Sequence, residues 1–485
     1  MASHFAEPIP ARLLMWQRVR EYAVPPSMIE NATVRRAVGD WAGACAAARI
    51  DVDLDLRAVR DRHGTDLASR LRADLRRLAP DLLRWHMPRT APDGRLRPGL
   101  TVCLARYGAD GPAAPRLVVR TPPAWADAGQ RMSLALWEGS RDGAPPPHPH
   151  PHPDRRFRLD LHRHLWDGTR SAELARRCWA GETPPYGPES RDPEDHGPGP
   201  SRLPKHWAAE AELLLRADGH DPRGPFTVRF GTRGRGVFEL VAPDDGHAPV
   251  LRPVREALSA QVAAALPVLP DAAARPLPDL ELLRAGLLSA DRLHPLVAAA
   301  LPASGSVRPP VRGPVPEPGP AASVGADPHR VECLGEVHRI ALRDGVLTAV
   351  DHEPAQLARE ELLMALGGPG LPCLRAVDSV HRSPEALPAV RERLGHGDVA
   401  GALAVVESLL GPGAVLREGP LREALEAAVA GRLEDGRFRA GLVPVHPAAL
   451  VAHGSGRRPR LDRRLPRFLR GKRSSRNRPR IGFHG

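Results

Sequence analysis

Histidines gather in one segment of this chain, Pro145 to Asp167, which reads PPPHPHPHPDRRFRLDLHRHLWD and holds five of the 21 histidines. Imidazole is a common metal ligand, so this density directs attention to metal chemistry. In the first half of the segment, prolines alternate with histidines and hold the backbone near the polyproline conformation, which has three residues per turn. His148, His150 and His152 then point in different directions, and no converging metal cage is expected there.

The second half of the segment alternates apolar and polar residues from Phe157 to Leu165, as a half-buried strand does. A two-residue spacing places Asp160, His162 and His164 on one face of the expected strand. We therefore predict a strand that carries two imidazoles and a carboxylate side by side. The alternative interpretation is a strand whose exposed face is charged and rich in histidine without binding a metal.

The string from Asp160 to Leu165 resembles the Asp-x-His-x-His signature of amidohydrolases and related phosphoesterases, over about six residues. The resemblance implies a metal-dependent hydrolase in which His162 and His164 bind a divalent metal such as zinc, with Asp160 as ligand or orienting partner. Such enzymes draw further ligands from later strands of a (β/α)₈ barrel of ~250 residues. After Trp166, however, the chain predicts one helix, Thr169 to Trp179, and then a stretch rich in proline and glycine.

Other catalytic chemistries find little support in the residue types. Lys205 and Lys472 are the only lysines, and neither lies in a glycine-rich phosphate loop, which argues against lysine-dependent chemistry. The five cysteines contain no C-x-x-C pair and imply no disulfide framework. Zinc-type ligands occur late in the chain at spacings that match no known pattern, so we do not predict a zinc site from them; they are Cys333, His338, His352, Cys373 and His381.

Two arginine-rich features could bind anions. The first is a glycine-rich hairpin, Gly231 to Gly236, in which Arg233 and Arg235 could touch an anion, although no helix N-terminus follows to hold a phosphate. The second is the tail from Arg457 to Gly485, whose eleven arginines and Lys472 against one aspartate account for +11 of the formal net charge of +12. We expect the tail to be disordered and to bind nucleic acid or another polyanion without sequence preference. The tail residues expected to make these contacts are Arg463, Arg464, Arg467, Arg470, Lys472 and Arg473.

Length and composition set the architecture into which these candidate residues must fit. A chain of 485 residues exceeds the size of a single core, so several modules are expected. The patterns predict an α+β multidomain fold with an N-terminal helical region, small mixed sheets, helical hairpins, proline-rich linkers and a basic tail. The expected boundaries are 1–90 for a helical module, 91–185 for a β-containing module with the Pro/His-rich loop, 186–204 for a linker, 205–301 for an α+β module with the Gly/Arg hairpin, 302–328 for a proline-rich linker, 329–445 for an α+β and helical module, and 446–485 for the tail.

These observations favour a protein that works by binding. We expect a multi-module scaffold or regulatory accessory protein without its own catalysis and without a cofactor, since no second ligand cluster accompanies Asp160, His162 and His164. The identity of a protein partner does not follow from the sequence. No run of 18 apolar residues predicts a transmembrane segment, and a cytoplasmic location is expected. The metal-dependent hydrolase and the polyanion-binding protein stay as alternatives.

Overall fold

The computed structural model describes residues 9–108, 114–123, 128–139, 152–177, 203–204, 206–230, 234–241, 250–254, 258–301, 330–443 and 446. They belong to two compact units. The first unit holds the residues before Arg308 except the short turn Ala128–Gln130, and the second holds that turn together with the chain from Arg308 to Gly456. Helices dominate and the strands form several small sheets, so the expected α+β multidomain fold is confirmed.

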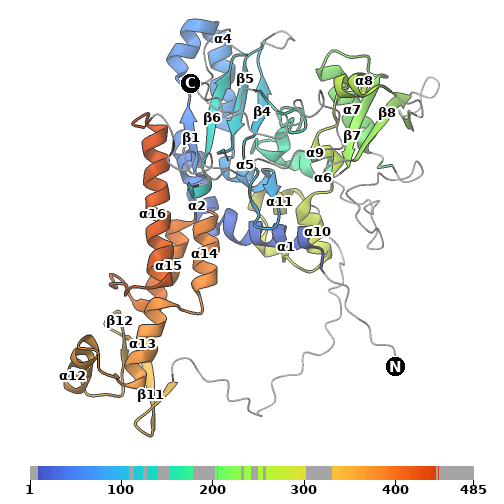
Figure 1. Ribbon diagram of the computed structural model, residues 1–485. Coiled ribbons are helices and arrows are strands. Elements are labelled where there is room, and N and C mark those ends of the chain that lie inside the picture. The colour runs from blue at the N-terminus through green and yellow to red at the C-terminus, as the bar shows by residue number, and fades with distance from the viewer. Residues whose placement is uncertain are drawn as a thin grey trace, which may run out of the picture. The chain divides into compact units, whose positions relative to one another are not determined.

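The first unit begins with helices, as the sequence patterns predict (Figure 1). They are α1 (Ala11–Arg18), continued by a π-helical turn (Val19–Ala23), then α2 (Pro26–Ala37), α3 (Trp41–Ala47), α4 (Leu56–Arg77) and α5 (Pro80–His86). Gly39 has a left-handed φ of 78° between α2 and α3, and the Asp40 side chain caps α3 by accepting a hydrogen bond from Gly43 N. The helices α2 and α3 thus form a helical hairpin at Gly39-Asp40, of the kind that the sequence patterns predict.

A four-stranded sheet lies at the centre of the first unit, with the order β1-β6-β5-β4 (Figure 1). Its strands are β1 (Ile50–Asp53), β4 (Thr101–Arg106), β5 (Arg116–Arg120) and β6 (Met132–Trp137), and a short ladder joins β2 (Arg89–Thr90) to β3 (Arg95–Leu96). β1 pairs with β6 in parallel and the other pairs are antiparallel. β4, β5 and β6 are nearly continuous in buried residues, which explains their apolar sequences.

The rest of the first unit contains a second small sheet and short helices. They are α6 (Leu174–Arg177), α7 (His206–Ala217), β7 (Pro225–Phe230), β8 (Gly234–Val241), β9 (Val250–Pro253), α8 (Ala260–Ala265), α9 (Asp271–Ala274), α10 (Pro278–Arg284) and α11 (Pro295–Ala300). Trp207 of α7 packs on Phe226, Phe230 and Phe238 of the β7–β8 hairpin. The last helices instead join the main core around Trp85 and Trp166.

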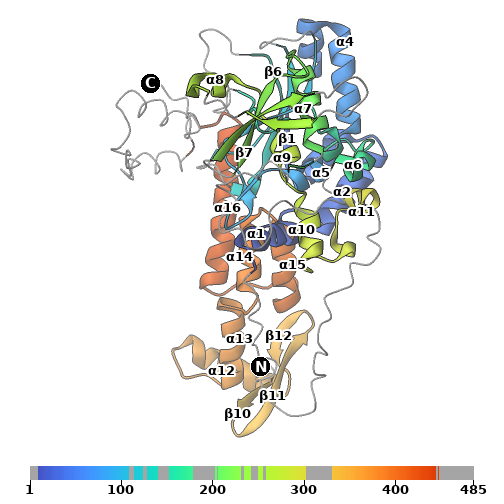
Figure 2. The same cartoon turned by 90° about the vertical axis from the view of Figure 1, so that its right-hand side faces the viewer.

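The second unit has a three-stranded antiparallel sheet followed by helices (Figure 2). Its elements are β10 (Arg330–Cys333), β11 (Glu336–Arg343), β12 (Val346–Ala349), α12 (Pro354–Ala365), α13 (Pro372–Arg382), α14 (Leu387–Gly395), α15 (Val399–Leu410) and α16 (Pro420–Arg439). Asp344 and Gly345 have φ values of 54° and 80°, as the tight turn between β11 and β12 requires. The helices α14 and α15 form a second helical hairpin around Gly397-Asp398.

One prediction is wrong, and several fall outside the described residues. Phe157 to Leu165 is not a strand: it consists of turns and a 3₁₀ helix, Arg163–Leu165, with a single bridge from Arg158 to Cys103. His148, His150, Arg233, the linker 302–328 and the basic residues of the tail lie outside the described part of the chain. Among the described helices, none combines the length and the apolar character that a membrane span needs.

Candidate functional site

The segment that carries Asp160, His162 and His164 turns on itself instead of extending. Its backbone makes hydrogen bonds between residues three apart, such as His162 N to Leu159 O at 3.1 Å and Leu165 N to His162 O at 3.0 Å. A strand would send these donors to a neighbouring strand. The alternation of apolar and polar residues does not separate a buried face from an exposed one here, because Arg158 and His162 are as buried as Phe157 and Leu159.

His162 has a close polar neighbour at each ring nitrogen. Its Nδ1 lies 3.0 Å from the backbone oxygen of Arg158, and its Nε2 lies 3.1 Å from the carboxylate of Glu210 on α7. Arg177 donates to both Glu210 oxygens, at 2.8 and 2.5 Å, and to the backbone oxygen of Leu161. Burial alone would raise the pKa of Glu210, but hydrogen bonds from His162 and Arg177 outweigh it and lower the pKa to about 2. Glu210 is thus a buried anion with two partners.

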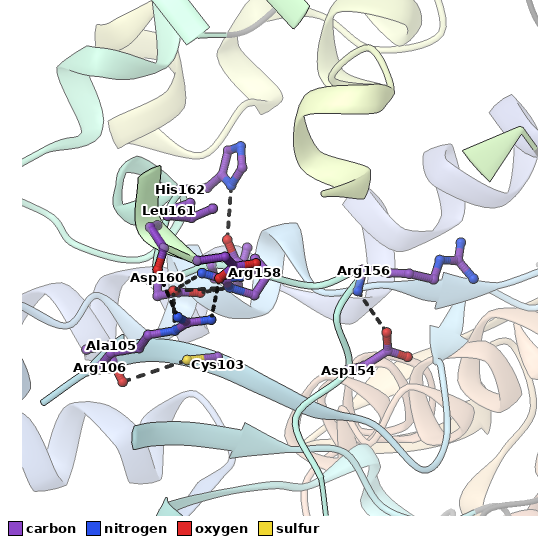
Figure 3. Close-up of polar contacts among 12 residues, drawn as sticks. Cys103, Ala105, Arg106, Asp154, Arg156, Arg158, Asp160, Leu161 and His162 are labelled. Carbon is purple, nitrogen blue, oxygen red and sulfur yellow. Dashed lines mark hydrogen bonds and ion pairs between the residues drawn. The ribbon is translucent and has the colours of Figure 1, made fainter. Parts of the chain in front are cut away.

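Asp160 is engaged by arginines (Figure 3). Arg158 donates to it from Nε and from NH2, both at 2.8 Å, and Nε of Arg106 lies 3.2 Å away. The same two arginines also contact the carboxylate of Asp218. Figure 3 shows the His162 ring pointing away from the Asp160 carboxylate. The geometry therefore uses Asp160 to neutralise guanidinium groups on the sheet, and not as a partner of the imidazoles.

His164 completes the cluster beside His162. The two rings meet edge to face with centroids 5.7 Å apart, and His164 is buried. Burial, followed by the neighbouring His162 and Arg177, holds the pKa of His164 well below its usual range, so the ring is neutral. A neutral imidazole can bind a metal. The structure nevertheless does not gather Asp160, His162 and His164 into one ligand set, because their ligand atoms do not all lie within 4.8 Å of one another.

Within the described residues, one group of histidine, cysteine and carboxylate side chains does converge as metal ligands do. It comprises Cys333, His352 and Cys373, whose ligand atoms all lie within 4.8 Å of one another. All three residues are buried, and both cysteines are free thiols. Burial, together with the hydrogen bond and the charge of neighbouring Cys333, raises the pKa of the Cys373 thiol to about 12. The Cys373 thiol therefore stays protonated unless a cation compensates its charge.

His352 has the surroundings of a ligand, too. Its Nδ1 lies 3.4 Å from the side-chain oxygen of Gln356, whereas its Nε2 is buried without a hydrogen-bond partner. The ring of His338 stacks on it with centroids 4.1 Å apart and planes 6° apart. His381, the fifth residue considered from the sequence, lies elsewhere, beside Asp378 and Arg417. Of the late Cys and His residues, four thus come together and one does not.

The anion-binding candidates are described only in part. Arg235 is exposed on β8, and its guanidinium donates a 3.3 Å hydrogen bond to the backbone oxygen of Ala263, which fastens the hairpin to α8. Arg233 and the basic residues of the tail lie outside the described residues. Arg235 therefore already has a partner within the unit, and the expected contact with an anion stays a prediction.

Comparison with known proteins adds no name to these sites, since no family model, no curated protein and no solved structure matches the chain. Sequence reasoning missed Glu210 and Arg177 as the partners of His162, because they come from distant elements. It also rejected the Cys333, His352 and Cys373 group on spacing. A usable signal was present: Cys333 precedes a Leu-Gly pair, His352 follows the strand β12, and Cys373 follows the proline that starts α13.

Proposed function

We propose that this protein works by binding another protein through its second unit, with α12 as the recognition helix. One observation carries the proposal. The face of α12 that bears Ala355, Ala358, Leu362 and Ala365 is exposed along its whole length, and Leu366 extends it just beyond the helix. Leu362 is 63% exposed and Leu366 is 78% exposed, and α12 has no buried residue. The spacing of 3, 4 and 3 residues is that of a coiled-coil contact face.

This apolar face is separate from the one that attaches the helix to its own unit. Leu357 and Met364 of α12 pack on the small core formed around Leu371 and Leu374. At 100° per residue, they lie on a different side of the helix from Leu362. The exposed stripe is therefore not needed for the fold of the unit. Contiguous exposed apolar surface of this kind is typical of interaction sites.

Exposed apolar side chains are also concentrated in the second unit as a whole. Of the 19 large apolar side chains that are exposed among the described residues, 12 belong to this smaller unit. Scattered single residues would be ordinary, but a concentration in one unit supports a binding role for that unit. The first unit, in contrast, directs its buried charges into internal pairs such as Arg20 with Asp279.

The charge around the stripe favours a protein partner over a membrane. Glu353, Glu360 and Glu361 outweigh Arg359 on and beside α12, so the helix has a net negative charge. Helices that bind membrane surfaces are rich in lysine and arginine on the polar face. The small side chains of Ala355, Ala358 and Ala365 allow a second helix to approach closely. The partner that fits is an amphipathic helix with an apolar stripe and basic flanks.

A pair of matched positions tests the proposal. Leu362 on α12 and Leu433 on α16 are exposed to 63% and 62%, and both lie in helices of the second unit. A photoreactive residue at position 362 should give one discrete adduct in cells that produce the protein, and the same residue at 433 should not. With the purified partner, Leu362→Glu should weaken binding more than tenfold, because burying a leucine contributes about 2 kcal/mol, whereas Leu433→Glu should not.

Four results would contradict the proposal. The first is the absence of an adduct from position 362, and the second is an equal adduct from both positions. The third is an adduct between two copies of this chain, accompanied by loss of a dimer in Leu362→Glu during sedimentation. That result would assign the stripe to self-association in place of a separate partner. Normal binding of the purified partner by Leu362→Glu would likewise refute the role of α12.

The geometry gives less support to the two alternative functions, a metal-dependent hydrolase and a polyanion-binding protein. For a hydrolase built on Asp160, His162 and His164, the arginine pairs of Asp160 and the Glu210 contact of His162 would first have to be broken. Breaking a buried ion pair costs about 3–5 kcal/mol. Polyanion binding rests on the tail, whose residues lie outside the described part of the chain. Protein binding through α12 is the function that the described surface supports best.

A further inference from the structure

We propose that Cys333, His352 and Cys373 bind one zinc ion, which fastens the β10–β12 sheet to helices α12 and α13. The three residues come from separate elements of the second unit. Cys333 ends β10, His352 lies between β12 and α12, and Cys373 is the second residue of α13. A metal held by all three would cross-link the sheet, the start of one helix and the start of the next.

The local backbone aims these side chains at one point. After Cys333 the chain turns through Leu334 and Gly335, which have left-handed φ values of 58° and 85°, and returns as β11. Pro372 begins α13 and places Cys373 in its first turn. Ligand atoms around a tetrahedral zinc ion are separated by roughly 3.3–3.8 Å, given Zn–S and Zn–N bonds of about 2.3 and 2.0 Å. The ligand atoms all lie within 4.8 Å of one another, so shifts of the side chains by about 1 Å would bring them to these separations.

The donor set identifies the class of metal. Thiolate sulfur and imidazole nitrogen are the ligands of zinc and similar soft or borderline ions, whereas calcium and magnesium require oxygen ligands. Cys333 and Cys373 supply two sulfurs, and both are 0% exposed. Structural zinc sites usually have four protein ligands, so this set of three fastens the elements while one coordination position stays open. Three protein ligands leave one coordination position for a water molecule.

An unpartnered polar atom points to a ligand independently of the cysteines. Nε2 of His352 is buried without a hydrogen-bond partner, although such an atom costs free energy if it stays unpaired. Its other nitrogen faces Gln356, which matches the arrangement of a ligating histidine whose second nitrogen is oriented by an outer residue. His338 stacks on this ring and holds its plane. We therefore assign Gln356 and His338 as positioning residues for the His352 ligand.

The core of the second unit around this site is small enough that a bound metal would add substantially to its stability. The core around the site is small and consists of Cys333, Ala349, Leu371, Cys373 and Leu374 with partly buried neighbours. α12 adds no buried residue to it. Small modules with little buried apolar surface commonly rely on a metal or a disulfide for stability. Zinc binding would therefore contribute directly to the folding of this part of the unit.

The test is metal analysis of the full chain, produced without a histidine tag in medium that contains zinc and purified under reducing conditions. Wild type should hold about one equivalent of zinc. Cys333→Ser/Cys373→Ser should hold less than ~0.2 equivalents. The matched control Cys45→Ser/Cys103→Ser replaces two buried free cysteines of the first unit and should keep the full content. His338→Ala should still bind zinc, but its affinity for zinc, measured by competition with a chelator, should be about 10- to 100-fold lower.

A second measurement guards against a variant that fails to fold. Removing zinc from the wild-type protein with a chelator should speed hydrogen exchange in residues 330–382, and adding zinc should restore protection. Exchange in β4 and β5 of the first unit serves as the internal reference. Three results would overturn the proposal. They are less than ~0.2 equivalents of zinc in wild type, as much zinc in Cys333→Ser/Cys373→Ser as in wild type, or a Cys333–Cys373 disulfide in wild-type protein that was purified under reducing conditions. If hydrogen exchange in residues 330–382 does not change when the chelator is added, zinc has no structural role there.

Discussion

Replacement of Glu210 by glutamine gives the sharpest test of the buried network around His162. Glu210 is only 5% exposed, and it accepts two hydrogen bonds from Arg177 while lying 3.1 Å from His162 Nε2. Glutamine keeps the shape of the side chain but removes the charge and leaves the Arg177 guanidinium without its anion. Breaking one partner of a buried ion pair typically costs about 3–5 kcal/mol.

The pKa of Glu210 gives an independent estimate of the same quantity. The folded protein lowers this pKa to about 2 from an ordinary value near 4.5. Each pKa unit corresponds to about 1.4 kcal/mol, so the carboxylate contributes about 3 kcal/mol to stability above pH 5. Because the folded pKa is depressed, this contribution is present above the unfolded pKa and is lost as the pH falls toward 2. The difference between wild type and Glu210→Gln should therefore shrink between pH 5 and pH 2.

Urea unfolding followed by tryptophan fluorescence measures this difference in the first unit, because all eight tryptophans precede residue 208. Glu212→Gln is the matched control on the same helix, since Glu212 pairs with Arg216 at side-chain exposures of 31% and 64%. An exposed pair of this kind contributes less than about 0.5 kcal/mol. Equal effects of the two substitutions at pH 7, or a Glu210→Gln effect that does not change between pH 5 and pH 2, would refute the reasoning.

Three further predictions concern the fold around the sites. Asp279→Ala should lower the free energy of unfolding by about 3–5 kcal/mol in the same fluorescence assay, because Arg20 donates to Asp279 at 2.9 and 2.7 Å inside the core; a loss below 1 kcal/mol would contradict the pairing. Asp398→Ala should lower the free energy of opening of α15 by about 1–2 kcal/mol, as measured by hydrogen exchange. This loss should exceed that of Asp40→Ala in α3, because the Asp398 side chain is 3% exposed and the Asp40 side chain is 41% exposed. Equal losses would show that burial of the cap does not matter. Burial raises the pKa of both Cys45 and Cys103 to about 12, so mass spectrometry after treatment with a thiol reagent should find them unmodified until urea unfolds the protein, and rapid native labelling would disagree with their burial.

Local signals in the sequence were sufficient for the elements that short-range physics determines. Asp344-Gly345 supplied the left-handed turn of the β11–β12 hairpin, and Gly39-Asp40 supplied a stop and a cap for two helices. The prediction of a strand from Phe157 to Leu165 was wrong because the polar residues of this segment are buried against partners from distant elements. Glu210, for example, lies beside His162. An alternating pattern implies a strand only if the polar face is solvated, and nothing in the local sequence reports that condition.

The converging cysteines and histidine show the same limit for sites. Cys333, His352 and Cys373 lie far apart in sequence and match no spacing rule, because their meeting depends on the pairing of β10 with β11 and on the position of α13. Each residue lies at or next to the end of an element: Cys333 ends β10, His352 follows β12 and Cys373 is the second residue of α13. Tertiary pairing of those elements, which single-sequence patterns do not contain, is what turned separate residues into one group.

The most direct measurement of the central claim, that Cys333, His352 and Cys373 bind one zinc ion, is X-ray absorption at the zinc edge on the full-length protein. Cys333, Cys373 and His352 predict two sulfur ligands at about 2.3 Å and imidazole nitrogen at about 2.0 Å. Cys333→Ser/Cys373→Ser should lose the sulfur shell. A wild-type spectrum with only nitrogen and oxygen ligands would contradict the claim, because it would place any bound zinc on histidines or carboxylates away from the two cysteines.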